Sequence, residues 1–139
     1  MTKRSLLFGA LALTATLGAC DLGYEVCTTH FPSGEVWSVR YYTDGRPDRP
    51  WIAWHVNEVP EQRTYYDGGQ RTGIWETYAP NGRLLFQREY LADQPHGEWV
   101  RYHLNGTKAS TATYDAGRAI GTWTWWNDQG DVIAEQRFE

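Results

Sequence analysis

Histidines and cysteines are the side chains in this sequence best suited to metal or covalent chemistry. They are His30, His55, His96, His103, Cys20 and Cys27. A zinc site needs several such ligands, each about 2 Å from one ion. His55 and His103 occupy the same position in two units of a 24-residue repeat, with one unit between them, which separates them by roughly 20 Å in a sheet. The sequence therefore predicts no metal site and no cofactor, and we interpret the histidines as surface or half-buried side chains.

The sequence lacks the common catalytic motifs. It has no Gly-x-Ser-x-Gly elbow, no phosphate-binding loop and no His-Glu-x-x-His pair. Its carboxylates are spread one or two to a hairpin, which is typical of a solvated face. The net charge is −4, and −6 without Lys3 and Arg4; such acidity disfavours nucleic acid and anionic headgroups. We expect a protein that is not an enzyme and does not bind nucleic acid.

The first 19 residues have the features of a secretory signal. Lys3 and Arg4 form a basic start, and an apolar run follows from Leu6 to Leu17. The run is shorter than the roughly 20 apolar residues that span a bilayer. We interpret residues 1–19 as a leader that is removed from the mature protein.

The end of this leader, Leu17-Gly18-Ala19-Cys20, resembles a bacterial lipobox. The resemblance implies diacylation of Cys20, cleavage before it, and a tether over residues 20–24, so that acyl chains alone attach the protein to a membrane. Asp21 resembles the signal that keeps enterobacterial-type lipoproteins at the periplasmic face of the inner membrane. The alternative is an ordinary signal with a chance cysteine, in which case a Cys20–Cys27 disulfide becomes possible.

The rest of the chain is a tandem repeat. The pattern Gly-x-Trp-x-x-Tyr at Gly73, Trp75 and Tyr78 recurs after 24 residues and again after 24 more. The recurrences are Gly97, Trp99, Tyr102 and Gly121, Trp123, Trp126. With two weaker units before them, the repeats divide residues 25–139 into 25–48, 49–72, 73–96, 97–120 and 121–139. Cys27 stands in a column that is otherwise Trp, so we expect it to be buried.

Each unit is predicted to be a β-hairpin. Asn81-Gly82 favours a two-residue type I′ turn, because both positions need positive φ, and Asn105-Gly106 repeats it. Pro60 follows the weaker turn at Asn57-Glu58, which predicts a distorted or edge hairpin. Aromatic residues make up 15% of the chain, and they suit half-buried strands. We expect an all-β fold: a single twisted antiparallel sheet of about five tandem 24-residue hairpins, as a solenoid or meander.

The turn position also predicts the register. Gly73 should face Tyr90, leaving room for its ring, and Trp75 should lie on the same side. Tyr78 should lie on the other face, against Leu85. The equivalent expectations are Gly97 with Tyr114, Gly121 with Phe138, Tyr102 with Ala109 and Trp126 with Ile133. We interpret the recurring glycine and aromatic columns as structural.

The pattern G-x-W-x-x-Y-x-x-N-G, with a later Tyr and a Gly-Lys/Arg linker, resembles the bacterial variant of the membrane occupation and recognition nexus (MORN) repeat. This variant is found in the antitoxin-like proteins called the YwqK family. The likeness covers residues 49–139 well and 25–48 weakly. It implies protein–protein or membrane-surface association rather than catalysis. Cell-wall choline-binding repeats have a similar period, but only residues 123–126 approach their aromatic cluster.

Residues that break the repeat are the candidates for specificity. On the Tyr78 face, units three to five are mostly charged or small outside a central aromatic stripe, whereas units one and two are apolar. The predicted binding residues are Trp37, Tyr41, Ile52, Trp54 and Tyr65. Contiguous exposed apolar surface and clustered Trp and Tyr indicate an interaction site. The opposing interpretations are that twist or the N-terminal segment covers this face, or that Pro60 reverses the register of the second hairpin.

Two function classes follow from the sequence. The first is a lipid-anchored interaction module of the cell envelope, a scaffold or an antitoxin-like inhibitor that binds another envelope protein. The alternative is a repeat protein that binds glycan or peptidoglycan through exposed aromatic side chains.

Overall fold

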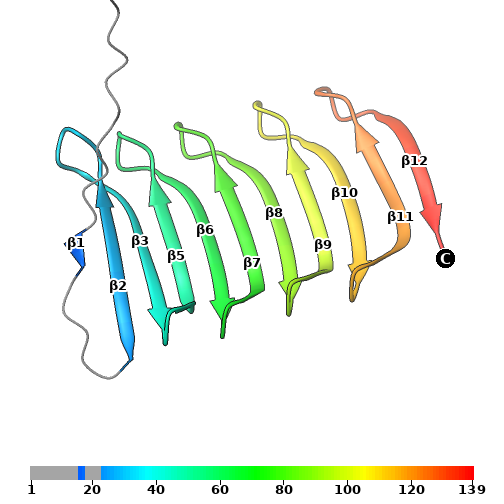
Figure 1. The fold of residues 1–139 in the computed structure, drawn as a ribbon. Helices are drawn as coiled ribbons and strands as arrows, with labels where there is room; N and C mark the ends of the chain where they lie inside the picture. Colours follow the sequence, from blue (N-terminus) through cyan, green and yellow to red (C-terminus); the bar gives the residue numbers. More distant parts are fainter. Residues whose placement is uncertain (1–15, 18–22) are drawn as a thin grey trace, which may run out of the picture.

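The computed structural model describes residues 16–17 and 23–139. Within them the chain forms strands and no helix, and the strands make one open antiparallel sheet (Figure 1). The strands are β1 (Thr16–Leu17), β2 (Tyr24–His30), β3 (Val36–Thr43), β4 (Arg46–Pro47), β5 (Arg49–Trp54), β6 (Pro60–Asp67), β7 (Gln70–Tyr78), β8 (Leu84–Leu91), β9 (Gln94–Tyr102), β10 (Lys108–Asp115), β11 (Arg118–Trp126) and β12 (Val132–Phe138). The predicted all-β meander of hairpins is confirmed. The described residues include no helix able to cross a membrane.

The five hairpins stand side by side in sequence order, from β2 in blue to β12 in red (Figure 1). Only β4 leaves this path, and it pairs with the end of β3. Residue contacts are concentrated between neighbouring strands. Within the described residues the sheet is a single layer, so most side chains on both faces are half-buried or exposed.

A continuous row of aromatic rings, which we call the aromatic ladder, stabilises one face of this sheet. Neighbouring ring centroids lie 4.5–5.3 Å apart, with planes inclined by 43–60°. Tilted contacts of this kind suit the charge distribution of aromatic rings. Trp75 contacts Tyr90, as predicted. The ladder runs through Tyr42, Trp51, Tyr66, Trp75, Tyr90, Trp99, Tyr114, Trp123 and Phe138.

The repeating glycine marks a β-bulge. Gly73 pairs with Tyr90 as predicted. Glycine is needed at this position because the backbone is left-handed there, with a φ of +63°. The bulge lies between the Glu76 and Thr72 pairs with β6. Trp75 Nε1 donates to the carbonyl of Tyr65 there, at 3.1 Å. The Trp75 side chain thus donates a hydrogen bond to β6 at the point where the bulge interrupts the backbone pairing of β6 and β7.

The hairpin loops differ from the predicted type I′ turns. Gly82 N donates to Ala79 O and Ala79 N donates to Arg83 O, both at 2.8 Å. Gly82 has positive φ and Asn81 does not. The loop is therefore a β-turn followed by a left-handed glycine, the arrangement of three-residue hairpins. Consecutive positive φ values occur instead in the linkers between units, as at Gly68–Gly69.

This loop moves the register of the strand ends by one residue. Tyr78 pairs with Leu84, and a bulge separates this pair from Thr77 and Phe86. The predicted pairing of Tyr78 with Leu85 was therefore wrong. The same correction applies to the other two predicted pairs: Tyr102 faces Lys108 and Trp126 faces Val132.

The second hairpin is regular, contrary to the prediction from Pro60. Trp54 pairs with Pro60, as the equivalent residues do in the other units. His55 N donates to Val59 O at 2.8 Å and closes the same loop. Glu58 takes the left-handed position with φ +62°. The register of this hairpin is not reversed, because Pro60 begins the strand just after the loop bulge.

Cys27 is half-buried, so the expectation of a buried thiol was wrong. It pairs with Arg40 at the start of the sheet, and the described ladder begins only at Tyr42. In the described structure, the ladder therefore begins on β3, the strand after the one that carries Cys27. Cys20, the predicted lipid attachment site, lies outside the described residues.

Candidate binding surfaces

The histidines connect one hairpin loop to the next. His55 Nε2 donates to the carbonyl of Tyr78, and His103 Nε2 donates to that of Trp126, both at 2.9 Å. Among residues 16–17 and 23–139, no group of three or more His, Cys, Asp or Glu side chains could hold a metal ion. These hydrogen bonds give the two histidines a structural role, and both side chains are half-buried, as expected.

Opposite the aromatic ladder lies a surface that we call the far face. Three of the predicted binding residues lie there on neighbouring strands: Ile52 continues the row of Val39, and Tyr41 and Tyr65 both lie on the linker side of that row. Tyr65 is 40% exposed, as is Val26 opposite Tyr41. The structure therefore brings an apolar group together on the first two hairpins.

The other two predicted binding residues lie nearer the loops. Trp37 packs against Phe31, with ring centroids 6.3 Å apart. Trp54 lines a shallow hollow of about 250 Å³ with Glu35, Val36 and Glu58. Trp37 and Trp54 are both half-buried, so each presents part of its ring to solvent.

The far face changes character along the sheet. The cross-strand row that begins with Val39 and Ile52 continues as Arg63, Glu76 and Gln87. Beyond these, the face carries Glu89, Glu98, Thr111 and Thr113 together with two apolar side chains, Ile74, which is 44% exposed opposite Glu89, and Val100, which is buried opposite Gln87. The uninterrupted apolar part of this row, Val39 and Ile52, is therefore at its N-terminal end, and charged and apolar side chains are mixed beyond it.

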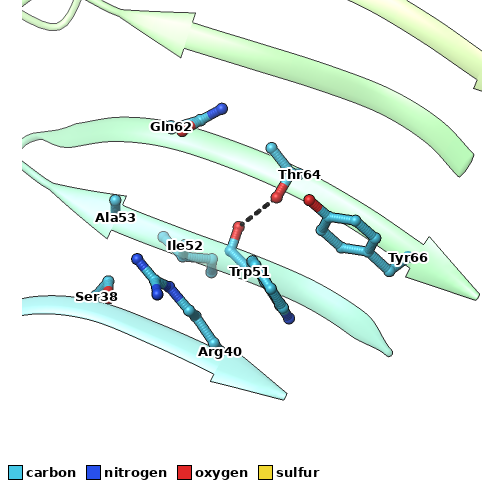
Figure 2. Close-up of a pocket in the computed structure, with 8 residues that line it drawn as sticks. All are labelled: Ser38, Arg40, Trp51, Ile52, Ala53, Gln62, Thr64 and Tyr66. Atoms are coloured by element: carbon cyan, nitrogen blue, oxygen red, sulfur yellow. Dashed lines mark hydrogen bonds between the residues drawn. The ribbon is translucent and has the colours of Figure 1, made fainter. Parts of the chain in front are cut away.

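The ladder face has a hollow that the sequence interpretation did not predict. Its volume is about 200 Å³, and Figure 2 draws the Arg40 side chain extending into it with its guanidinium directed toward Ala53. The guanidinium carbon lies 5.5 Å from the centre of the Trp51 indole, within the range of a cation–π contact. Figure 2 shows the lining, which is Ser38, Arg40, Trp51, Ile52, Ala53, Gln62, Thr64 and Tyr66.

A second hollow repeats the first one two units later. It has a volume of about 170 Å³, and Arg88 again lies 5.5 Å from a Trp, here Trp99. Its lining is Phe86, Arg88, Trp99, Val100, Arg101, Ser110 and Ala112, each in the repeat column of a residue in the first hollow. The recurrence of Arg40 as Arg88 was the signal available in the sequence.

Buried rings and linker hydrogen bonds shift several pKa values. Burial raises the pKa of Tyr66 and of Tyr114 in the ladder, because the charged phenolate would be poorly solvated there. In the linker, hydrogen bonds from the Arg71 backbone and side chain lower the pKa of Asp93. Arg71 Nε lies 3.0 Å from Asp93 Oδ1, which joins two neighbouring linkers.

Comparison with known families gives one match. Residues 71–92 and 95–116 match the family model described as MORN repeat variant. These segments cover the hairpins β7–β8 and β9–β10 except for the first residue of β7 and of β9. No curated protein matches the chain. The third and fourth hairpins are therefore MORN-variant repeats, and such repeats in an open sheet indicate a repeat-based binding module.

Proposed function

We propose that this protein is a membrane-tethered interaction module that binds another cell-envelope protein through the far face of its first two hairpins. The proposal rests on the change in side-chain type along that face, from the apolar and aromatic Tyr41, Ile52 and Tyr65 to the acidic Glu76 and Glu89. Repeat columns that recur in every unit maintain the fold, so a partner is distinguished by the units that depart from them.

The chemistry of this surface fits a protein with an apolar patch. Trp and Tyr are enriched among binding hot spots, where they bury large rigid surfaces. The acidic residues beyond the patch, Glu76 and Glu89, favour basic residues at the edge of the partner's contact surface. An antitoxin-like inhibitor is one form of such a module.

The proposed anchor is a diacylated Cys20 at the periplasmic face of the inner membrane. The lipobox-like end of the leader and Asp21 support this assignment. Strand β2 begins at Tyr24. The four residues from 21 to 24 reach at most roughly 14 Å, so the first hairpins would lie close to the bilayer and to membrane-embedded partners.

Metabolic labelling with a radioactive fatty acid tests the anchor. We expect label in the wild-type protein and none in Cys20→Ala, which lacks the acylated thiol. Equal labelling of the two proteins would refute the lipoprotein assignment.

Crosslinking in intact cells, followed by membrane solubilisation and capture, tests the surface. Trp37→Ala combined with Tyr65→Ala should abolish recovery of the specific crosslinked partner. The matched control is Ile133→Ala with Arg137→Ala, which changes the same repeat columns in the last unit. Circular dichroism must show that both variants remain folded. Loss of the partner in the control alone would place the binding site on the last hairpin and would refute the proposed site on the first two.

A further inference from the structure

We propose that the two hollows on the ladder face bind a carboxylated polysaccharide, with Arg40 and Arg88 each pairing with a carboxylate of the chain. This site is on the opposite face from the proposed protein-binding surface. It takes a different class of ligand and does not depend on that function.

Charge is unevenly divided between the two faces. The whole protein has a net charge of −4, yet no Asp or Glu lines either hollow. Within residues 16–17 and 23–139, no ion pair involves Arg40, Arg88 or Arg101. Carboxylates of the central strands, such as Glu76 and Glu89, lie on the far face by strand alternation. The ladder face also carries Glu25, opposite Tyr42 at the edge of the first hairpin. The two hollows themselves therefore complement a carboxylated chain although the protein is acidic.

The geometry prepares each arginine to bind a carboxylate. Trp51 Nε1 donates to the Tyr41 carbonyl at 2.8 Å, and Trp99 Nε1 donates to the Glu89 carbonyl at 2.9 Å. These bonds fix the orientation of both indoles. The guanidinium of Arg40 lies near Trp51, and that of Arg88 lies near both Trp99 and Phe86. These ring contacts limit the freedom of each guanidinium and leave its planar set of N–H donors for an anion. Arginine pairs with carboxylates through two parallel hydrogen bonds.

The rest of the lining favours a sugar over other anionic ligands. Gln62 is exposed at the first hollow and offers an amide, while Trp51 and Tyr66 offer apolar ring surface. A few polar groups among aromatic walls are typical of small-molecule sites, and pyranose rings present both hydroxyl and C–H surfaces. The ladder planes are inclined to each other by 43–60° and pack together, so successive nucleic-acid bases have no series of open faces for stacking.

A bilayer surface is a poorer fit to this face. The large apolar side chains that protrude most are Leu104 at 74%, Ile133 at 65% and Val56 at 63% exposure; Leu104 and Val56 lie in hairpin loops and Ile133 lies at the start of β12, so none belongs to the ladder. The ladder rings are half-buried, and Tyr90 is buried. They are therefore held within the sheet surface, where they cannot insert among acyl chains.

The spacing of the hollows favours a polymer. Equivalent strands two units apart are separated by four strand steps, or about 19 Å. A chain with repeated carboxylates can occupy both hollows, and the second contact then forms intramolecularly. A single uronic acid cannot bridge this distance, so it should bind much more weakly than an oligomer.

Calorimetric titration of the purified full chain tests the proposal, with oligogalacturonate of about ten units as the probe. We expect saturable binding, weaker by at least about tenfold for galacturonic acid and for the carboxyl-reduced, neutral oligomer. Arg40→Gln with Arg88→Gln should weaken oligomer binding about a hundredfold. Arg63→Gln with Arg137→Gln removes the same charge from the far face and should change it less than about threefold.

Several results would overturn the proposal. They are the absence of saturable oligogalacturonate binding, equal losses in the two double variants, and equal binding of the neutral oligomer. Tighter binding of single-stranded DNA or of phosphatidylglycerol vesicles would assign the face to another ligand class. Neither double variant changes Trp37 or Tyr65, and partner capture can be measured on Arg40→Gln with Arg88→Gln. Failure of either proposal is thereby distinguishable from failure of the other.

Discussion

The glycines that begin the last two repeats show how one residue type meets two different constraints. Gly97 and Gly121 have similar left-handed φ values, +63° and +68°. A Cβ on Gly97 would overlap the carboxylate of Glu89, whereas a Cβ on Gly121 would meet nothing within 4 Å. Gly97 is thus constrained by both conformation and space, and Gly121 by conformation alone.

Alanine at these two glycines separates the constraints. Gly121→Ala should destabilise by about 1–2 kcal/mol, the cost of a left-handed L-residue. Gly97→Ala should cost about 1 kcal/mol more, because Glu89 must move. Urea unfolding measures both. Equal losses would mean that Glu89 moves freely, and that the crowding has no effect on stability.

Asp93 gives the protein a specific sensitivity to acid. Hydrogen bonds from Arg71 lower its pKa below the ordinary value of 3.8. A lowered folded-state pKa stabilises the fold above pH 3.8, and this contribution is lost as pH falls through the folded pKa. Asp93→Asn should therefore reduce the loss of stability between about pH 5 and pH 2, measured by urea midpoints.

Asp67→Asn is the control for this pH dependence. Asp67 is also an exposed aspartate, the last residue of β6 beside a linker, and its side chain makes no hydrogen bond within the described part of the chain. If both variants reduce the loss of stability at low pH equally, the effect comes from the general reduction in negative charge and not from the Arg71 contact.

Among the elements, the hairpin loops share one geometry despite different sequences. Four loops place glycine in the left-handed position, as Gly34, Gly82, Gly106 and Gly130. The second loop places Glu58 there with φ +62°. The closing hydrogen bonds are the same in all five loops. The loop conformation is therefore determined by the hairpin and tolerates a strained residue.

Glu58→Gly should stabilise the second hairpin. Relief of the left-handed conformation gains about 1–2 kcal/mol, offset in part by the greater freedom of glycine in the unfolded chain. The expected net gain is about 0.5–1 kcal/mol, measured by chemical denaturation. Glu58→Ala removes the same charge but keeps the strain, so it should give no gain. A similar gain in both variants would attribute the effect to charge.

For the whole molecule, the contact pattern defines a one-dimensional array. Each hairpin pairs with its neighbours in the sheet, and loop contacts such as His103 to Trp126 also join adjacent units. Stability in such an array is the sum of unit and nearest-neighbour contributions. Damage at one end should therefore decline with distance.

Deletion of residues 121–139 tests this behaviour. The remaining hairpins should stay folded, with hydrogen exchange faster in β10, which becomes the edge strand, and little changed in β6 and β7. The full-length protein is the reference. Uniform loss of protection from β2 to β10 would show instead that the sheet folds as one cooperative unit.

The sequence by itself determined the period, the five hairpins and the face of the aromatic ladder. These features follow from local chemistry: side chains alternate along a strand, and Trp75, Trp99 and Trp123 recur with one spacing. Pairs such as Gly73 with Tyr90 are confirmed because the centre of each hairpin is independent of the detailed loop type. The grouping of Tyr41, Ile52 and Tyr65 on one face follows from the same alternation.

The tertiary structure alone decided the loop type and the hollows. Asn81-Gly82 is compatible with a type I′ turn and with a β-turn before a left-handed glycine, and the strand twist and pairing select the second. That one-residue difference gives Tyr78 the partner Leu84. The hollows form where Arg40 and Arg88 lie near a Trp of the next hairpin. Such contacts depend on how neighbouring units pack, which no pattern within a single repeat specifies.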